Sequence, residues 1–133
     1  MSKFELENLD VFQLALDAAV QADAVAQALP RGRAYLADQI RRAVSSVVLN
    51  IAEGAGEWLR PEKEKFYRYA KRSAVETGAA IVLVEKLQLA SLDLTGPVRS
   101  LLLKLIPMMM GLIRHCGPEI FERRPGEASG QRA

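Results

Sequence analysis

The chain has one cysteine, Cys116, and one histidine, His115, among its 133 residues. One cysteine cannot form an intramolecular disulfide, so the sequence favours a reducing compartment and predicts a cytoplasmic protein. Adjacent residues of a helix point in different directions, so this cysteine and histidine are poorly placed to act as a nucleophile and its base. A zinc site needs three or four protein ligands, which this pair does not supply. The sequence therefore predicts neither a metal site nor a cysteine-based catalytic site.

Other functional motifs are absent as well. The sequence contains no glycine-rich phosphate-binding loop and no paired Glu-x-x-His pattern of di-iron bundles. Its N-terminus has no signal-peptide pattern, and its longest apolar stretch, residues 100–113, is interrupted by Lys104 and Pro107. We therefore expect no cofactor, no small-molecule substrate and no membrane partner. Three functional classes are considered: a scaffold or adaptor, a nucleic-acid-binding protein and an enzyme. The enzyme is the least favoured of the three.

The composition is that of a soluble helical domain. Half of the residues are hydrophobic, 26% are charged and only 6% are aromatic, which favours helix over sheet. Apolar residues recur at helical spacing in four segments, and nowhere does a strand-like alternation persist. The predicted helices span residues 10–28, 33–58, 61–90 and 97–116. Four helices joined by short loops predict an all-α, up-down-up-down four-helix bundle in one domain, residues 1–116. Proline, glycine and polar residues in 117–133 predict a disordered tail.

Local signals set the expected helix ends. Asp10 is a suitable N-cap for the first helix, and Pro61 fits the first turn of the third. Asp93 or Thr95 is the expected cap of the fourth helix, which Pro107 should kink. Gly54, near the end of the second helix, implies either fraying or the close approach of a neighbouring backbone.

The second helix carries two adjoining stripes. Its apolar face comprises Leu36, Ile40, Ala43, Val44, Val47, Val48, Ile51 and Gly54. A narrow polar face, within an arc of roughly 80° at 100° per residue, comprises Gln39, Arg42, Ser46, Asn50 and Glu53. Polar groups that border a core must be paired or must face a specific partner.

Three segments carry a family resemblance. Residues 4–14 are F-E-L-E-N-L-D-V-F-Q-L, residues 39–54 are Q-I-R-R-A-V-S-S-V-V-L-N-I-A-E-G, and residues 66–76 are F-Y-R-Y-A-K-R-S-A-V-E. Together they resemble a bacterial four-helix-bundle family first noted as reading frames inside intervening sequences of 23S ribosomal RNA genes. The resemblance covers residues 4–115. It implies a left-handed bundle that forms ring-like homo-oligomers, often pentamers, and it supplies no catalytic role.

The same resemblance marks signature positions and a related branch. The signature positions are Gln39, Arg42, Ser46, Asn50, Glu53, Ser73 and Glu76. The related branch comprises accessory proteins of diversity-generating retroelements, which bind nucleic acid and a reverse transcriptase.

Two interpretations of the polar stripe follow. The favoured one is a structural network in which Arg42 pairs with Glu53 or Glu76, and Asn50 and Ser46 bond to the backbone or to Ser73. The alternative is contact with a ligand or nucleic acid.

A basic segment opens the third helix. Residues 60–72 contain six Lys or Arg and two Glu, whereas residues 1–59 contain five basic and eight acidic residues. The basic residues are Arg60, Lys63, Lys65, Arg68, Lys71 and Arg72. One interpretation is a phosphate-binding face for RNA or DNA. The other is a solvated face on which Glu62 and Glu64 form i,i+3 and i,i+4 ion pairs.

The apolar arc of the second helix is wider than one helix seam requires. Val48, Trp58, Leu59 and Tyr67 are therefore expected at a subunit interface. The favoured function is that of a non-enzymatic, homo-oligomeric scaffold or adaptor, with a pentamer implied by the resemblance. A nucleic-acid-binding accessory protein is the alternative.

Overall fold

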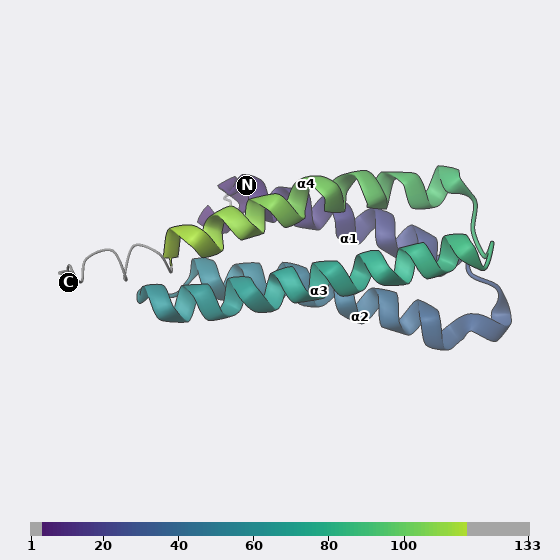
Figure 1. Ribbon diagram of the computed structural model, residues 1–133, viewed down its shortest axis with the longest axis horizontal. Helices are drawn as coiled ribbons and strands as arrows, with labels where there is room; N and C mark the ends of the chain where they lie inside the picture. Colours follow the sequence, from purple (N-terminus) through teal and green to yellow (C-terminus); the bar gives the residue numbers. More distant parts are fainter. Residues whose placement is uncertain (1–3, 117–133) are drawn as a thin grey trace, which may run out of the picture.

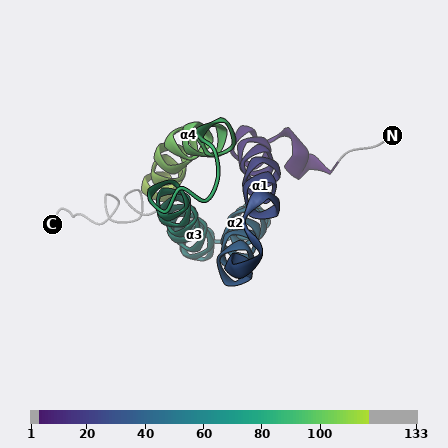
Figure 2. The ribbon, with the colours of Figure 1, turned by 90° about the vertical axis from the view of Figure 1, so that its right-hand side faces the viewer.

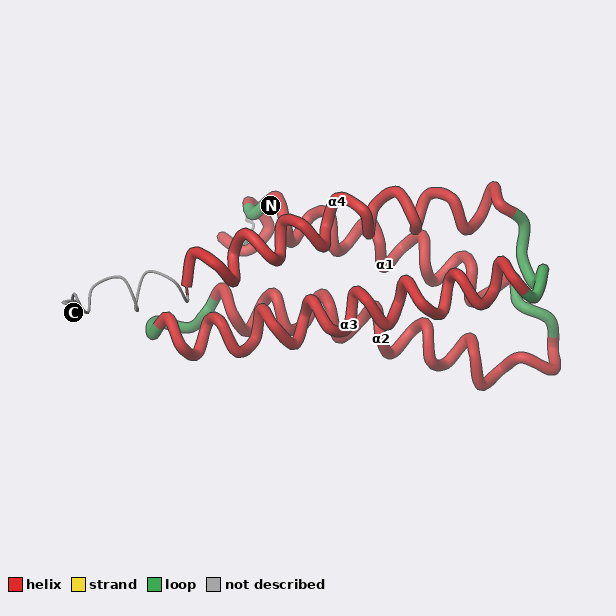
Figure 3. Tube along the Cα trace, viewed as in Figure 1, coloured by secondary structure: helices red, strands yellow, loops and turns green. Residues whose placement is uncertain are grey.

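The computed structural model describes residues 4–116, which fold into four long helices. These are α1 (Asp10–Ala28), α2 (Ala34–Ala55), α3 (Arg60–Lys86) and α4 (Leu92–Cys116), with short 3-10 turns at Glu5–Asn8 and Arg31–Arg33. Successive helices run in opposite directions (Figures 1 and 3). The predicted all-α, up-down-up-down four-helix bundle is confirmed. The tail predicted for residues 117–133 lies outside the described residues.

Each helix packs on two neighbours. The main contacts join α1 to α2, α2 to α3, α3 to α4, and α4 back to α1. An end-on view shows α1 and α3 at diagonally opposite corners (Figure 2). The core between them includes Ile40 and Ile51 of α2, Ile81 of α3, and Leu105 and Met109 of α4, each at most 1% exposed. The predicted apolar face of α2 points into this core, and only Val48 of that set is half-buried.

The end of α2 differs from the expectation. The helix ends at Ala55, three residues earlier than predicted, and Gly56 is its C-cap. Gly54 does mark a close approach, but the neighbour is an aromatic ring rather than a backbone. A Cβ built on Gly54 would lie 2.5 Å from Cε1 of Tyr67. Tyr67 is only 6% exposed, so its expected place at a subunit interface is wrong.

The end of α3 is set by an unusual residue. The helix stops at Lys86 instead of residue 90 because Gln88 adopts a left-handed conformation, with φ of 55°. The Gln88 N–H donates to the Glu85 carbonyl and the Leu89 N–H donates to the Val84 carbonyl, each at 3.0 Å. This pattern is a Schellman motif, in which glycine usually occupies the left-handed position.

The start of α4 also corrects the sequence prediction. The helix begins at Leu92, five residues earlier than expected, and Asp93, Thr95 and Pro97 lie inside it. The Ser91 carbonyl accepts the N–H groups of Leu94 and Thr95, at 3.0 and 3.1 Å, which starts the first turn. The helix then continues through Pro107 to Cys116.

The cap of α1 is likewise shifted by one residue. Leu9 is the N-cap and Asp10 is the first helical residue. The Asp10 carboxylate still lies in the first turn, where its negative charge interacts favourably with the positive end of the helix dipole.

Candidate functional site

The polar stripe of α2 lies along the edge of the α2–α3 seam. In its first half, Gln39 donates from Nε2 to Oε2 of Glu76 on α3. Arg42 donates from Nη2 to Oε1 of Gln39 at 3.2 Å. The Gln39 amide therefore links a cation on α2 with a carboxylate on α3. Arg42 and Glu76 are exposed and Gln39 is half-buried, so no buried charge is involved.

The second half of the stripe is a chain of short polar side chains. Asn50 donates from Nδ2 to both the carbonyl and Oγ of Ser46, each at 2.9 Å. Across the seam, Ser73 Oγ donates to Ser46 Oγ at 2.9 Å. Thr77 Oγ1 in turn donates to the Ser73 carbonyl at 2.8 Å. These bonds connect α2 with α3 at a point where small side chains allow close packing.

The structure does not bring every signature position together. Glu53 is exposed, and within residues 4–116 it forms none of the ion pairs expected of it. The expected pairing of Arg42 with Glu53 or Glu76 is replaced by the Gln39 bridge. The other six signature positions are joined in two groups, around Gln39 and around Ser46.

The basic residues at the start of α3 have different roles. Lys63 donates from Nζ to the carbonyls of Gly54 and Ala55, at 3.1 and 3.3 Å. A lysine at the end of a helix can donate hydrogen bonds to the last carbonyls, which lack partners within the helix. Its positive charge also interacts favourably with the negative end of the helix dipole. Lys63 is therefore used to cap α2. Arg60 is half-buried as the first residue of α3.

Two of the remaining cations are neutralised by neighbouring acids. Lys65 forms a 2.9 Å ion pair with Glu62, and Arg68 forms a 2.7 Å ion pair with Glu64. The Glu62 carboxylate raises the pKa of Lys65, first through its hydrogen bond and then through its charge. These are the i,i+3 and i,i+4 pairs of the solvated-face interpretation.

Two cations of the segment have no acidic partner in the part of the chain that the structure describes. Lys71 is half-buried and Arg72 is exposed. The Arg72 guanidinium lies over the ring of Tyr69, 5.7 Å from its centroid, in a cation–π contact. The free positive charge is thus smaller than the sequence count suggests.

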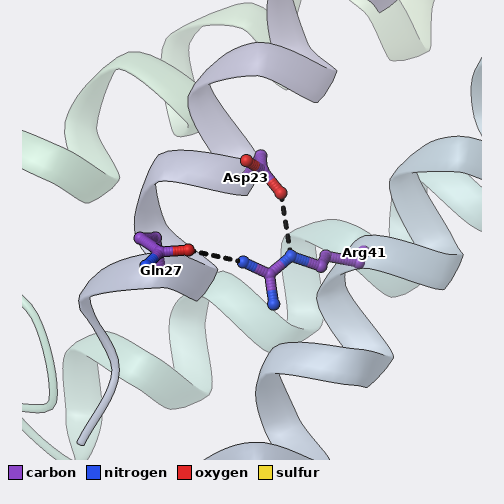
Figure 4. Close-up of polar contacts among 3 residues, drawn as sticks. All are labelled: Asp23, Gln27 and Arg41. Carbon is purple, nitrogen blue, oxygen red and sulfur yellow. Dashed lines mark hydrogen bonds and ion pairs between the residues drawn. The ribbon is translucent and has the colours of Figure 1, made fainter.

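Two ion pairs between helices were not predicted from the sequence. Arg41 of α2 donates to Asp23 at 2.8 Å and to Gln27 at 3.1 Å, both on α1 (Figure 4). Arg99 of α4 pairs with Glu85 of α3. The hydrogen bond from Arg99 is the main cause that lowers the pKa of Glu85. No sequence spacing could reveal these pairs, because each joins different helices.

The grooves of the bundle offer little enclosed space. An apolar pocket of about 150 Å³ lies between α3 and α4, lined by Gly78, Ile81, Val82, Arg99, Leu102, Leu103 and Ile106. Within residues 4–116, no three His, Cys, Asp or Glu side chains form a group that could hold a metal ion. Cys116 is buried, which raises the pKa of its thiol, and His115 beside it is exposed.

Helix α4 is unusually apolar. It is long and apolar enough to cross a membrane by length and composition, with a mean hydropathy of 1.4 over 18 residues, of which 28% are buried. Core helices of soluble bundles meet the same criterion. Leu92, Leu103 and Met110 on its outer side are 71%, 68% and 41% exposed.

Comparison with known proteins agrees with the family resemblance. No curated protein matches the chain. A family model, the 23S rRNA-intervening sequence protein, matches residues 7–111. This range spans all of α1, α2 and α3 and most of α4, so the match covers the bundle itself. The chain belongs to the 23S rRNA-intervening sequence protein family.

Proposed function

We propose that this protein is a non-enzymatic, homo-oligomeric scaffold or adaptor of the cytoplasm. The observation that carries the proposal is the number of large apolar side chains on the outside of the bundle. Val20 of α1, Leu49 of α2, Val75 of α3 and Leu103 of α4 are between 50% and 68% exposed. Trp58 in the α2–α3 loop is 94% exposed. These side chains lie on all four helices and in one loop, and large exposed apolar side chains, Trp above all, are common at protein–protein contacts.

The predicted interface residues fit this proposal in part. Trp58 and Leu59 are exposed, at 94% and 67%, and are free to contact another subunit. Val48 packs against the core as a half-buried residue, and Tyr67 is buried within the subunit.

The mass in solution tests the proposal. Size-exclusion chromatography with light scattering should give a multiple of the 14.6 kDa chain mass at micromolar concentration, with five subunits favoured. A constant monomer mass across the concentration range would contradict it. The variant Trp58→Ser, at an exposed loop position, tests whether the α2–α3 loop is part of the contact between subunits. A lower mass would assign the loop to this contact, while an unchanged mass would place the contact on the helices.

A second candidate function is nucleic-acid binding by the start of α3. The observation that favours it is the pair Lys71 and Arg72, which have no acidic partner in residues 4–116, next to Tyr69, which is 40% exposed. Phosphate contacts would make log affinity fall linearly with log salt concentration.

Binding of labelled RNA and DNA at two salt concentrations tests this second function. Replacing both Lys71 and Arg72 by Gln should reduce the magnitude of the salt slope by about two for two lost phosphate contacts. Lys86→Gln, at the far end of α3, is the matched control and should leave the slope unchanged. No binding at low salt would remove this function and leave the scaffold proposal in place.

A further inference from the structure

Charge is distributed unevenly between opposite corners of the bundle. Helix α1 contains three aspartates, Asp10, Asp17 and Asp23, and no lysine or arginine. Asp23 is paired with Arg41, whereas Asp10 and Asp17 are exposed and have no basic partner among the described residues. Helix α3, diagonally opposite (Figure 2), begins with the basic segment. One flank of the molecule is therefore acidic and the other basic.

The two outer faces share a sequence pattern as well as opposite charge. Among the exposed residues of α1, one stripe at alternating spacings of three and four comprises Asp10, Gln13, Asp17, Val20 and Ala24. Among those of α3, a stripe with the same spacings comprises Lys65, Arg68, Arg72, Val75 and Ala79. Both sets have the same spacing, with two charged positions seven residues apart, then a valine three residues on and an alanine four residues after that. Seven residues are about two turns, so each set lies along one helix face.

The two sets also lie at the same height along the bundle. Arg41 bonds to Asp23 and Gln27, which places it level with the residues between them. Five residues back along α1 from this level is Val20, and five residues on along α2 is Ser46. Ser46 bonds to Ser73, two residues before Val75. Val20 and Val75 are thus level to within about one helical turn, since each residue rises 1.5 Å.

Both helices point the same way, because α1 and α3 are alternate members of an up-down-up-down bundle (Figure 1). A rotation about an axis parallel to the bundle therefore brings α1 of one copy beside α3 of another, parallel and without a vertical shift. Similar heights and equal spacing then align the two patterns to within about one helical turn.

We propose that the outer face of α1 docks against the outer face of α3 of a second copy of this chain. In this contact Asp17 faces Arg72 and Val20 packs on Val75, while Asp10 faces Lys65, which also pairs with Glu62 of its own helix. The inference rests on the proposed homo-oligomer and names the surfaces that form it. Val20 and Val75, at 67% and 50% exposure, supply the apolar centre. Ala24 and Ala79 next to them are small enough for the helices to approach closely.

Such a contact is heterologous, because it joins two different faces. An open chain of copies keeps one unused α1 face at one end and one unused α3 face at the other until the rotation closes a ring. The charged pairs lie beside the apolar centre and select unlike faces, since α1 against α1 or α3 against α3 would bring like charges together. The contact also occupies Lys65 and Arg72, so nucleic acid and a second copy would compete for this part of α3.

Cysteine cross-linking tests the pairing directly. In a Cys116→Ala background, the double variant Val20→Cys, Val75→Cys should form a ladder of covalent multimers on mild oxidation, because the two thiols meet only between copies. Each single variant should give no ladder. The pair Val20→Cys, Leu103→Cys is the matched control, since Leu103 is equally exposed on α4, and it should not form one either.

Charge reversal provides a second, independent readout. Asp17→Arg and Arg72→Asp should each weaken self-association by roughly tenfold or more, because each brings like charges together, and the double reversal should restore it. Asp38→Arg, at an exposed position of α2, should have no effect. Multimers that resist both single reversals and give no Val20–Val75 cross-link would overturn the pairing but keep the scaffold proposal. A wild-type monomer would remove both.

Discussion

At the scale of single residues, Gly54 is the position with the least room. A methyl group there would lie 2.5 Å from the ring of Tyr67, and the ring is held by the core. We expect Gly54→Ala to destabilise the protein by about 1–3 kcal/mol, as overpacking does. Gly111→Ala in α4 is the control, since nothing lies within 4 Å of its Cβ position. Because alanine has a higher helix propensity than glycine, Gly111→Ala should stabilise the protein by up to about 1 kcal/mol. Urea unfolding of both variants measures the difference, and equal effects would contradict the steric account.

The residues of the candidate site show what a sequence can and cannot predict. Spacing along one helix placed Gln39, Ser46 and Asn50 on a common stripe. It could not show that Gln39, not Arg42, meets Glu76, because partners on another helix depend on how the two helices dock. Tyr67 was misplaced for a related reason. It was expected at a subunit interface, but its ring fills the space beside Gly54 instead.

At the scale of helices, the Schellman motif after α3 is strained by its side chain. Gln88 holds a φ of 55°, which costs a residue with a Cβ roughly 1 kcal/mol more than glycine. Gln88→Gly should therefore raise stability by about 0.5–1 kcal/mol and increase the midpoint of thermal unfolding. Lys104→Gly, at an exposed position inside α4, is the opposite control, because glycine inside a helix is destabilising. A lower midpoint of thermal unfolding for Gln88→Gly would show that the left-handed conformation of Gln88 does not reduce the stability of the protein.

The link between α3 and α4 predicts a pH dependence. Arg99 lowers the pKa of Glu85 below its ordinary value, so the folded state favours the ionised carboxylate. This contribution is complete above the unfolded pKa of about 4.3 and is lost as pH falls through the lower folded pKa. Thermal unfolding of wild type and Glu85→Gln should differ at pH 7 and converge near pH 3. A difference that is constant with pH would contradict this role for the ion pair.

Helix ends were the least predictable elements. The four helices and the buried face of α2 followed from apolar spacing alone. The start of α4 did not, because the Asp93–Pro97 segment has the composition of a loop, yet the Ser91 carbonyl already accepts two N–H groups and begins the helix there. The end of α3 was missed because a left-handed glutamine leaves no sequence signal.

At the scale of the whole molecule, the opposed charges predict competition between assembly and polyanion binding. If α1 of a second copy covers α3, disrupting the assembly should expose Lys65 and Arg72. Asp17→Arg should then elute from a heparin column at higher salt than Asp38→Arg, although both variants carry the same charge change. Equal elution would show that the basic face is equally accessible in both.

The contact of Lys63 and Tyr67 with the end of α2 also bears on the order of folding. Lys63 reaches Gly54 across only nine residues, so closing this turn costs little chain entropy. Local contacts of this kind form early in helical proteins. The α2–α3 hairpin is thus placed to form before α1 and α4 dock. In stopped-flow experiments, Gly54→Ala should slow refolding and leave the unfolding rate nearly unchanged, as expected of a substitution in the folding nucleus.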